Sequence, residues 1–407
     1  MALGTIRVRS TQWGALLWAL AAVAFGTVAE AQMASVKTVF LIVLSTQPWG
    51  LIQGSASAPY INGTLLPMAS YATNYNSPAG ALTVQAEYFW LEAGSSFGVL
   101  PVGGIQSGRQ STSAHLVSLL NLAGVSWKSY QEDIDGSQCP LQSKALYLTV
   151  YNPFVYFDDV TDHFNPYSPF CIAHVRPYGE LATDLTSNSV ARYNFIRPNL
   201  CHAMARGCPT AGDRVKAGDA WLAAEVPKIL TSAAFLNGGV LLITWDHAGD
   251  ASADQRIGLL VISPFAKKGY ANAIRYTHGS TLRTLQEMLG VSSTLLGDAA
   301  VEQDLSDFFE TSTLGQSALS ISWAASPGAT GYGVRRALAS TGPYVTVAAS
   351  LSETHYTDRS VAGGNTYFYV VTATNAAGES VASAPASGAA IAAPAAPTQV
   401  VVTQAPP

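Results

Sequence analysis

The chain has 407 residues, of which 48% are hydrophobic and only 12% charged, with a formal net charge of −5. A single core of this length would be unusually large, so we expect two domains. The charges form no acidic or basic blocks, so the composition argues against nucleic acid or an anionic membrane surface as a partner.

The first 31 residues have the pattern of a signal peptide. Arg7 and Arg9 precede an apolar run over 13–28, and residues 29–31 (Ala-Glu-Ala) fit a small-x-small cleavage site. The run is shorter than the roughly 20 residues that span a bilayer, which makes an uncleaved anchor the weaker alternative. We expect a secreted, periplasmic or cell-surface protein with no transmembrane segment after cleavage.

Residues 35–312 alternate strand and helix patterns. This order predicts an α/β domain with a mainly parallel sheet sandwiched by helices. Pro227 should kink or break the helix that contains it. The expected strands lie at 38–44, 238–244 and 257–263, and the expected helices at 113–123, 219–232 and 280–289.

One strand end carries unusual side chains. The apolar run over 238–244 opens directly into Asp246 and His247. The carboxyl edge of a parallel sheet is where such residues serve as metal ligands or acid/base groups. The alternative is that Asp246 simply caps the turn after the strand. The choice depends on whether other strand ends supply partners for Asp246.

After residue 313 the pattern changes to short alternating strands separated by Gly, Ser and Asn turns. Residues 316–388 therefore predict a small antiparallel β-sandwich, with Trp323 as a core aromatic and Tyr367 and Tyr369 on one face. The Ala/Pro-rich tail over 389–407 is expected to be an extended linker or a disordered end.

Four cysteines follow the predicted cleavage site. An even number in an exported chain favours disulfides over a metal or catalytic role. Cys201 and Cys208 would close a short loop, which leaves Cys139 to pair with Cys171. Four free buried thiols are the alternative.

Two resemblances follow from longer segments. "SISWAASPGATGYGVRRALASTGPYVTV" and "TDRSVAGGNTYFYVVTATNAAGES" resemble a fibronectin type III domain, which implies a spacer or an adhesive surface. "GSASAPYINGTLLPMASYATNY", "FWLEAGSSFGV", "NPFVYFDDVT" and "YTHGSTLRTLQEMLGV" resemble the phosphoesterase family of secreted acid phosphatases and phospholipases C, within the alkaline-phosphatase-like superfamily. That family implies hydrolysis of phosphate esters, with a divalent metal and a hydroxyl nucleophile.

The resemblance places the family's nucleophile and first metal ligands at residues that do not suit these roles. The nucleophile position, just before "YFWLEAG", is Val84, and Thr83 could replace it only if the register slipped by one residue. The first strand should end in a Glu-Asn-His type of triplet, but it is followed by Ser45, Thr46 and Gln47.

Other family positions are substituted as well. Tyr151 stands where a His often precedes "NPFVYFDD", and residues 202–206 (His-Ala-Met-Ala-Arg) replace an Asn-Asp-x-His-Asp type of run. Asp246 and His278 survive as ligand-type residues, and His247 replaces a Glu. Metal ions normally neutralise the phosphate oxygens and activate the nucleophile. Two retained ligands are too few for a tight site.

The sequence therefore predicts a pseudoenzyme or a very weak hydrolase, with no divalent metal or a weakly bound one, that binds a phosphate-ester or cell-surface ligand. One alternative is an active phosphoesterase with a rebuilt site. In it Thr83 or Ser45 is the nucleophile, and Asp246, His247 and His278 hold a metal. Another is a secreted binding or adhesion module that acts through its β-sandwich. The pattern does not indicate an oligomeric state.

Overall fold

The computed structural model describes residues 33, 35–78, 83–99, 108–209, 212–249, 254–310, 319–358, 361 and 365–390. The predicted signal peptide and nearly all of the predicted tail lie outside these residues. Within the described ranges, no helix has the length and apolar character needed to cross a membrane.

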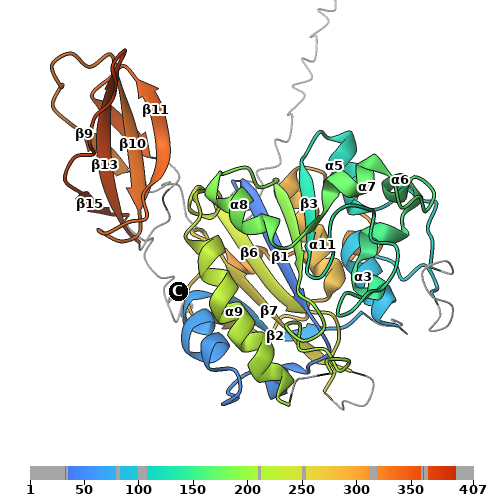
Figure 1. Ribbon diagram of the computed structural model, residues 1–407. Helices are drawn as coiled ribbons and strands as arrows, with labels where there is room; N and C mark the ends of the chain where they lie inside the picture. Colours follow the sequence, from blue (N-terminus) through green and yellow to red (C-terminus); the bar gives the residue numbers. More distant parts are fainter. Residues whose placement is uncertain are drawn as a thin grey trace, which may run out of the picture.

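The larger part of the chain is built on an eight-stranded sheet in the order β4-β3-β5-β1-β6-β7-β2-β8 (Figure 1). β7 runs antiparallel to both β6 and β2, and the other neighbours are parallel. The prediction of a mainly parallel sheet is confirmed. The strands are β1 (Thr38–Leu44), β2 (Ser70–Asn76), β3 (Trp127–Gln131), β4 (Val175–Pro177), β5 (Tyr193–Arg197), β6 (Gly239–Trp245), β7 (Arg256–Ile262) and β8 (Tyr270–Asn272).

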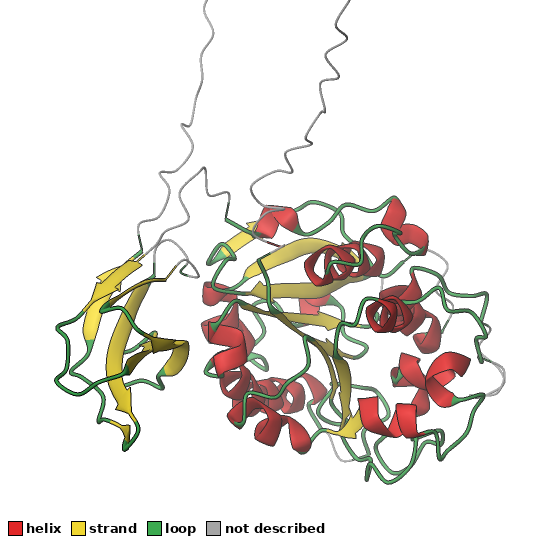
Figure 2. Cartoon of the chain, turned by 90° about the horizontal axis from the view of Figure 1, so that it is seen from above, coloured by secondary structure: helices red, strands yellow, loops and turns green. Residues whose placement is uncertain are grey.

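Helices cover both faces of this sheet, as the view from above shows (Figure 2). On one side α8 (Glu180–Thr186), α9 (Arg214–Leu230) and α10 (Ala233–Leu236) pack against one another, and on the other side α3 (Val84–Ala93), α5 (Leu116–Leu122) and α11 (His278–Leu289) do the same. Shorter helices are α2 (Leu66–Met68), α6 (Asp158–Thr161), α7 (Pro169–His174), η1 (Trp49–Leu51), η2 (Ile61–Leu65), η3 (Thr149–Tyr151), η4 (Pro153–Tyr156), η5 (Gly297–Ala300) and η6 (Ser306–Phe308).

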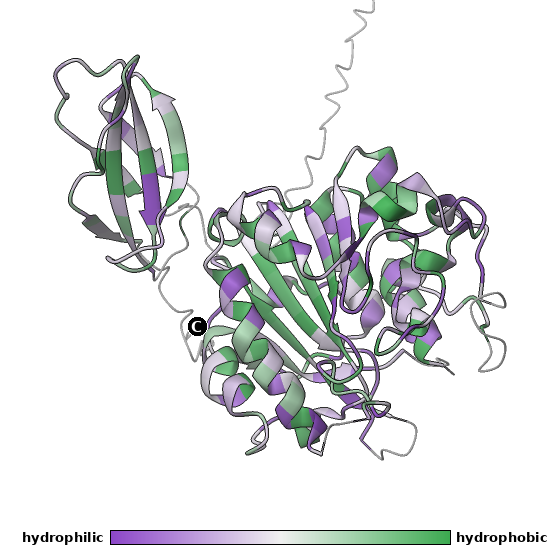
Figure 3. Ribbon diagram, viewed as in Figure 1, coloured by the Kyte–Doolittle hydropathy of each residue, from purple (hydrophilic) through white to green (hydrophobic). Residues whose placement is uncertain are grey.

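The central strands are apolar because both of their faces are covered. Every residue of β6 is buried, as are residues 39–44 of β1, and Figure 3 shows these central strands mainly in the green of hydrophobic residues. Burying an aliphatic or aromatic side chain of this size contributes about 1.5–3 kcal/mol. These strands therefore form a rigid platform, and their carboxyl ends hold the loops that follow them in fixed positions.

Two helices begin three or more residues away from their predicted starts. α5 begins at Leu116 rather than 113, because the ring of His115 is held outside the helix by Glu92 and Asp159. α9 begins at Arg214 rather than 219, because Asp213 accepts a hydrogen bond from the backbone N–H of Lys216 and caps it. The helix also continues through Pro227 to Leu230. A proline so near the end removes only one helical hydrogen bond.

The strands within residues 319–358 and 365–389 form an all-β sandwich, which resembles a fibronectin type III domain. One sheet pairs β9 (Leu319–Ser322) with β12 (His355–Asp358), and the other contains β10 (Gly331–Ala337), β11 (Val345–Leu351), β13 (Thr366–Asn375), β14 (Gly378–Glu379) and β15 (Ala386–Ala389). Tyr367 and Tyr369, predicted to share one face, both lie in the core. Trp323, predicted as a core aromatic, is only partly buried and packs against this core and against Tyr332.

A buried arginine joins the sandwich to the α/β part. Arg336 of β10 is 1% exposed, and its Nη1 donates to Asp358 Oδ2 at 2.8 Å. Its Nη2 donates to the carbonyl of Leu236 in α10. The Tyr369 hydroxyl also donates to Asp358, at 2.9 Å. The single carboxylate of Asp358 therefore orients the arginine that contacts the other part of the chain.

Candidate functional site

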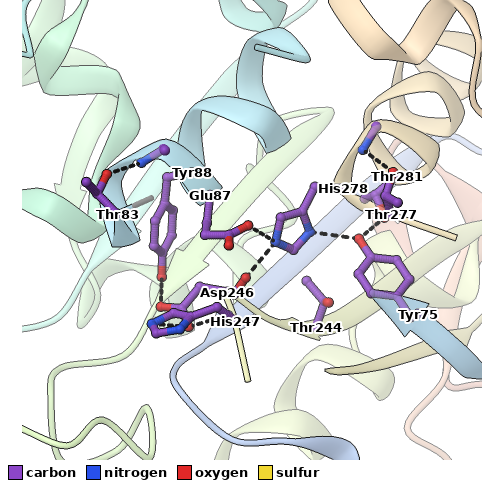
Figure 4. A network of polar contacts seen from close by, with 12 residues as sticks. Tyr75, Thr83, Glu87, Tyr88, Thr244, Asp246, His247, Thr277, His278 and Thr281 are labelled. Carbon is purple, nitrogen blue, oxygen red and sulfur yellow. Dashed lines mark hydrogen bonds and ion pairs between the residues drawn. The ribbon is translucent and has the colours of Figure 1, made fainter. Parts of the chain in front are cut away.

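A cluster of polar residues lies at the carboxyl edge of the sheet where β1 and β6 end. Leu44 pairs with Trp245, and the N–H of Asp246 donates to the Leu44 carbonyl at 2.9 Å. Ser45 and Asp246 therefore leave neighbouring parallel strands side by side. We call Ser45, Thr46, Tyr88, Asp246, His247 and His278 the Asp246 cluster; Figure 4 shows the part around Asp246 and His278.

The carboxylate of Asp246 is fully buried and accepts four hydrogen bonds. The backbone N–H groups of Thr46 and His247 donate to Oδ1 at 2.8 and 2.7 Å. The hydroxyls of Ser45 and Tyr88 donate to Oδ2 at 2.8 and 3.4 Å. Two carboxylate oxygens offer about four acceptor positions, so donors from the chain occupy all of them.

Thr46 and His247 face each other across this carboxylate. Thr46 has φ 46°, a left-handed conformation that is rare for a β-branched residue and marks local strain. Its Oγ1 lies 3.2 Å from His247 Nε2 and 2.9 Å from Ser45 Oγ. The N–H of Gly249 donates to His247 Nδ1 at 3.0 Å, so a neutral ring carries its proton on Nε2 and points it at Thr46. His247 is thus placed as a donor to Thr46 and not as its base.

His278 is the first residue of α11, and both of its ring nitrogens are bonded. Nε2 lies 2.8 Å from the carbonyl oxygen of Asp246 and Nδ1 lies 2.9 Å from the Tyr75 hydroxyl. Burial lowers the pKa of His278 to about 4, so the ring is neutral and its Nε2–H donates to the carbonyl. The helix is capped by Thr277 instead.

Glu87, which stands where the family resemblance places an Asn, lies in this region, although the sequence did not suggest it as a site residue. It lies in the first turn of α3, 4% exposed, with Oε2 3.5 Å from His278 Nε2. Burial, and then the nearby Asp246 carboxylate, raise the pKa of Glu87 well above its usual value. The sequence signal that could have indicated this residue is an acidic side chain among the uncharged residues at the start of this helix.

The predicted nucleophile region lies at the start of α3. Thr83 caps the helix, with Oγ1 accepting from the Ala86 N–H at 3.0 Å, and Figure 4 shows it turned toward its own helix. Val84 is the first helical residue and supplies only an apolar side chain. The structure therefore gathers Ser45, Asp246, His247 and His278 together, and it assigns Thr83 to a capping role.

These residues are a poor fit for a divalent cation. The four acceptor positions of Asp246 and both nitrogens of His278 are engaged by neighbouring groups. No three His, Cys, Asp or Glu residues within the described ranges are gathered as a metal site. A hard cation needs several oxygen or imidazole ligands with free lone pairs. Binding one here would require the cluster to rearrange.

Arg197 is a buried cation next to the cluster, and the sequence analysis did not predict it as a site residue. Arg197 ends β5, is 2% exposed, and donates from Nη1 to the Val43 carbonyl at 2.9 Å. Its guanidinium carbon lies 4.1 Å from the ring centre of Tyr151 and 5.7 Å from that of Tyr88. Burial, and then Asp246, raise the pKa of Tyr151, while Arg197 and a hydrogen bond with Ser45 act against this. Arg197 is thus linked to the cluster through Tyr151.

Residues 202–206, which replace the family's Asn-Asp-x-His-Asp type of run, lie in the loop closed by Cys201 and Cys208, and this loop borders the Asp246 cluster. Disulfides join Cys139 with Cys171 and Cys201 with Cys208, so the predicted pairing is confirmed. Within the second loop, the Ala203 carbonyl accepts from the Ser45 N–H at 2.7 Å, and the Met204 carbonyl accepts from Gln47 Nε2 at 3.1 Å.

The eight-stranded, mainly parallel sheet covered by helices on both faces defines an α/β protein. The model of the Phosphoesterase family matches residues 71–292, more than half of the chain, and the chain belongs to that family. Catalysis in this family generally depends on a metal ion.

Relatives and solved structures share modest similarity with the chain. A probable acid phosphatase of Kluyveromyces lactis is 21% identical over 64% of this chain and 59% of its own length. An acid phosphatase of Aspergillus fumigatus is 22% identical over 44% of this chain and 40% of its own length. The chain thus spans less than two thirds of either relative.

Among solved structures, an alkaline phosphatase superfamily protein from Vibrio parahaemolyticus has a TM-score of 0.46 at 11% identity, covering 73% of this chain and 80% of that one. The lipoteichoic acid synthase LtaP of Listeria monocytogenes has a TM-score of 0.45 at 12% identity, covering 65% and 74%. An Fn3-like protein from Clostridium thermocellum is 40% identical over 18% of this chain and 78% of that one, with a TM-score of 0.18.

Proposed function

We propose that this chain is an exported member of the Phosphoesterase family that binds a phosphate-ester or cell-surface ligand and hydrolyses phosphate esters very slowly or not at all. The two disulfides and the signal-like first 31 residues support export to an oxidising compartment. The similarity to acid phosphatases supports a phosphate ester as the ligand class.

One observation carries the proposal. Asp246 is the best metal-ligand candidate, but its carboxylate already accepts hydrogen bonds from Ser45, Thr46, Tyr88 and His247. The nucleophile position holds Val84, which has no hydroxyl. Loss of a nucleophile alone costs on the order of 10⁶-fold in the rate of a well-studied hydrolase. A site that lacks both parts is suited to hold a ligand and not to cleave it.

The test is hydrolysis of p-nitrophenyl phosphate and of a phospholipid by the purified, oxidised protein. The assay is run with Zn²⁺, Mn²⁺, Mg²⁺ or Ca²⁺ and with a chelator, together with elemental analysis of the protein. We expect no rate that depends on added metal. Family-like hydrolysis that a chelator and Asp246→Ala both abolish would instead establish the rebuilt-site alternative. Asp254→Ala, which changes a carboxylate that is 32% exposed and pairs with Arg256, is the matched control.

A further inference from the structure

His115 is fully buried between two carboxyl groups that come from different helices. Its Nδ1 lies 3.3 Å from Glu92 Oε1 in α3, and its Nε2 lies 3.0 Å from both carboxyl oxygens of Asp159 in α6. His115 itself directly precedes α5, so one imidazole ring joins three helices. The side chain of Glu92 is 2% exposed and that of Asp159 is 36% exposed. We call Glu92, His115 and Asp159 the His115 triad.

The geometry fixes how many protons the His115 triad shares. A neutral imidazole has one N–H group, and its other nitrogen is an acceptor. Both ring nitrogens of His115 face carboxyl oxygens, so each of the two contacts needs a proton of its own. The second proton lies either on the ring, as an imidazolium ion, or on Glu92. In both cases the triad carries one net negative charge.

The surroundings of the triad favour retention of this second proton. Burial opposes a charge on His115, but the hydrogen bonds with Asp159 and Glu92 outweigh burial and raise the pKa of the ring above its usual 6.5. Burial also raises the pKa of Glu92. The three groups titrate as a coupled unit. Both shifts therefore have the same result, which is a triad that still holds its second proton when an isolated histidine has lost it.

Neighbouring titratable groups have other partners or carry no charge. Asp158, next to Asp159 in α6, pairs with Arg109 at 2.7 Å and lies 3.5 Å from the exposed ring of His163. From the sheet, Tyr193 of β5 is close enough to be influenced by the charge of Glu92. Burial raises the pKa of Tyr193 well above its usual value, so this hydroxyl stays protonated.

Loss of the second proton leaves one contact of the triad without a donor. A neutral ring donates to only one carboxylate, and its other nitrogen then presents a lone pair to the second one. Glu92 is shielded from water, and its Oε1 also accepts from the Val117 N–H at 2.8 Å. Asp159 is exposed enough to be hydrated. An unpaired buried carboxylate costs more than a hydrated one, so the contact with Asp159 is the one that breaks.

Asp159 lies in a segment that depends on such contacts. α6 has only four residues, and residues 162–164, which follow it, have φ values of 50°, 59° and 71°. Consecutive left-handed residues other than glycine are costly and persist only where the surrounding structure holds them. Phe157, just before α6, stacks on the His115 ring with 3.8 Å between the ring centres. His115 thus contacts this segment twice, through Asp159 and through Phe157.

We propose that the His115 triad is a pH-sensitive latch, a contact that holds α6 and residues 162–164 in place in mildly acid solution and releases them as the solution becomes alkaline. The second proton leaves to water or hydroxide through the exposed carboxylate of Asp159, and no bond between heavy atoms changes. This inference goes beyond the proposed function, because it requires neither ligand binding nor hydrolysis in the cleft.

Hydrogen exchange of the oxidised full chain between pH 5.5 and 9 tests the latch. The reporter amides are those of Val160, Thr161 and His163, which donate within α6 and the turn after it. After correction for the intrinsic effect of pH on exchange, we expect constant protection below pH 6.5. Above it, protection should fall about tenfold for each unit by which the closed latch raises the apparent pKa of the triad. The Val117 amide should keep its protection, because Glu92 retains the ring.

Two variants remove the titration in different ways. An amide at position 159 can accept from the ring or donate to it, so Asp159→Asn should keep α6 closed and abolish the pH dependence of its protection. His115→Gln has no titrating ring and should also give a flat profile, which keeps the test informative if one variant does not fold.

Two matched controls lie in the same segment. His163→Asn removes the other imidazole, and Asp162→Asn removes an exposed carboxylate. Asn tolerates the left-handed conformation of both positions. Both control variants should therefore keep the pH dependence of the parent.

Protection of α6 that stays constant from pH 5.5 to 9 in the parent would overturn the latch. A pH dependence that persists in Asp159→Asn or His115→Gln would do the same, as would one that disappears in His163→Asn. These outcomes do not depend on whether the chain binds or hydrolyses an ester, so the latch and the proposed function fail separately.

Discussion

The pattern of hydrogen bonds around Asp246 explains how individual residues of the cluster depend on one another. Asp246 holds Thr46 in a strained backbone conformation through its Oδ1, and its carbonyl accepts from His278 Nε2, which selects the tautomer of the ring that burial keeps neutral. Glu87 approaches the same imidazole with its buried carboxyl group. Protonation states and backbone geometry are therefore coupled, and pH is the natural variable with which to examine them.

Neutral His278 should make the protein sensitive to acid. Its folded pKa of about 4 lies below the usual 6.5, so between these values the unfolded chain binds more protons than the folded one. This contribution to stability is complete above pH 6.5 and is lost as pH falls toward 4, by up to about 3 kcal/mol. The free-energy difference between parent and His278→Asn, measured by urea unfolding, should grow as pH rises from 4 to 6.5.

Glu87 contributes in the opposite direction, since its raised pKa makes stability fall as pH rises above about 4.5. For this reason the informative quantity is the difference between parent and variant, and not the parent profile alone. His163→Asn, at an imidazole whose side chain is 78% exposed, is the control for replacing a histidine elsewhere in the chain. A difference for His278→Asn that does not change between pH 4 and 6.5 would contradict a buried neutral ring.

At the scale of elements, the two disulfides connect segments that carry few regular elements. The Cys139–Cys171 bridge closes a loop of sequence separation 32 that includes η3, η4, α6 and part of α7, and the Cys201–Cys208 bridge closes one of 7. Constraint of the unfolded chain increases with loop length. The two bridges should therefore contribute unequally to stability.

Removing the longer bridge should cost more. Loop-closure entropy gives about 4 kcal/mol for Cys139→Ala/Cys171→Ala and about 2.5 kcal/mol for Cys201→Ala/Cys208→Ala. Urea unfolding of the two double variants, compared with the parent under oxidising conditions, measures both values, and each variant serves as the control for the other. A larger loss for the short loop would show that native contacts of residues 201–208 outweigh chain entropy.

Elements buried on both faces were the ones that the sequence predicted well. The strand over 38–44 has its predicted bounds because a continuous apolar run can only be satisfied inside such a sheet. The start of α5 could not be predicted, because His115 is held by acids distant in the sequence. Asp246 was found from its position after a strand. Glu87 and Arg197 were not, since their importance comes from burial and from neighbours on other elements.

At the scale of the whole molecule, one buried ion pair connects the β-sandwich with the α/β part. Arg336 and Asp358 are 1% and 0% exposed, and Arg336 also reaches the Leu236 carbonyl. Removing one partner of a buried pair leaves the other charge uncompensated, which usually costs more than the pair contributes.

Arg336→Leu should therefore destabilise the chain by about 3–5 kcal/mol, because Asp358 remains buried without its cation. Arg335→Leu is a matched control one residue away. Its side chain is 38% exposed and pairs with Glu379, so its loss should cost less than about 1 kcal/mol. The double variant Arg336→Leu/Asp358→Leu should recover part of the stability. Equal losses at positions 335 and 336 in thermal or urea unfolding would contradict this role.

The short disulfide also has a consequence for how the protein is prepared. The ring closed by Cys201 and Cys208 supplies the carbonyls that hold Ser45 and Gln47 beside the cluster. A bacterial or yeast cytosol keeps such thiols reduced. In material expressed there, or purified with a reducing agent, this disulfide would be reduced and the loop that bonds Ser45 and Gln47 would lose its constraint. The choice of an export pathway for recombinant production is thus part of any valid comparison of binding between variants.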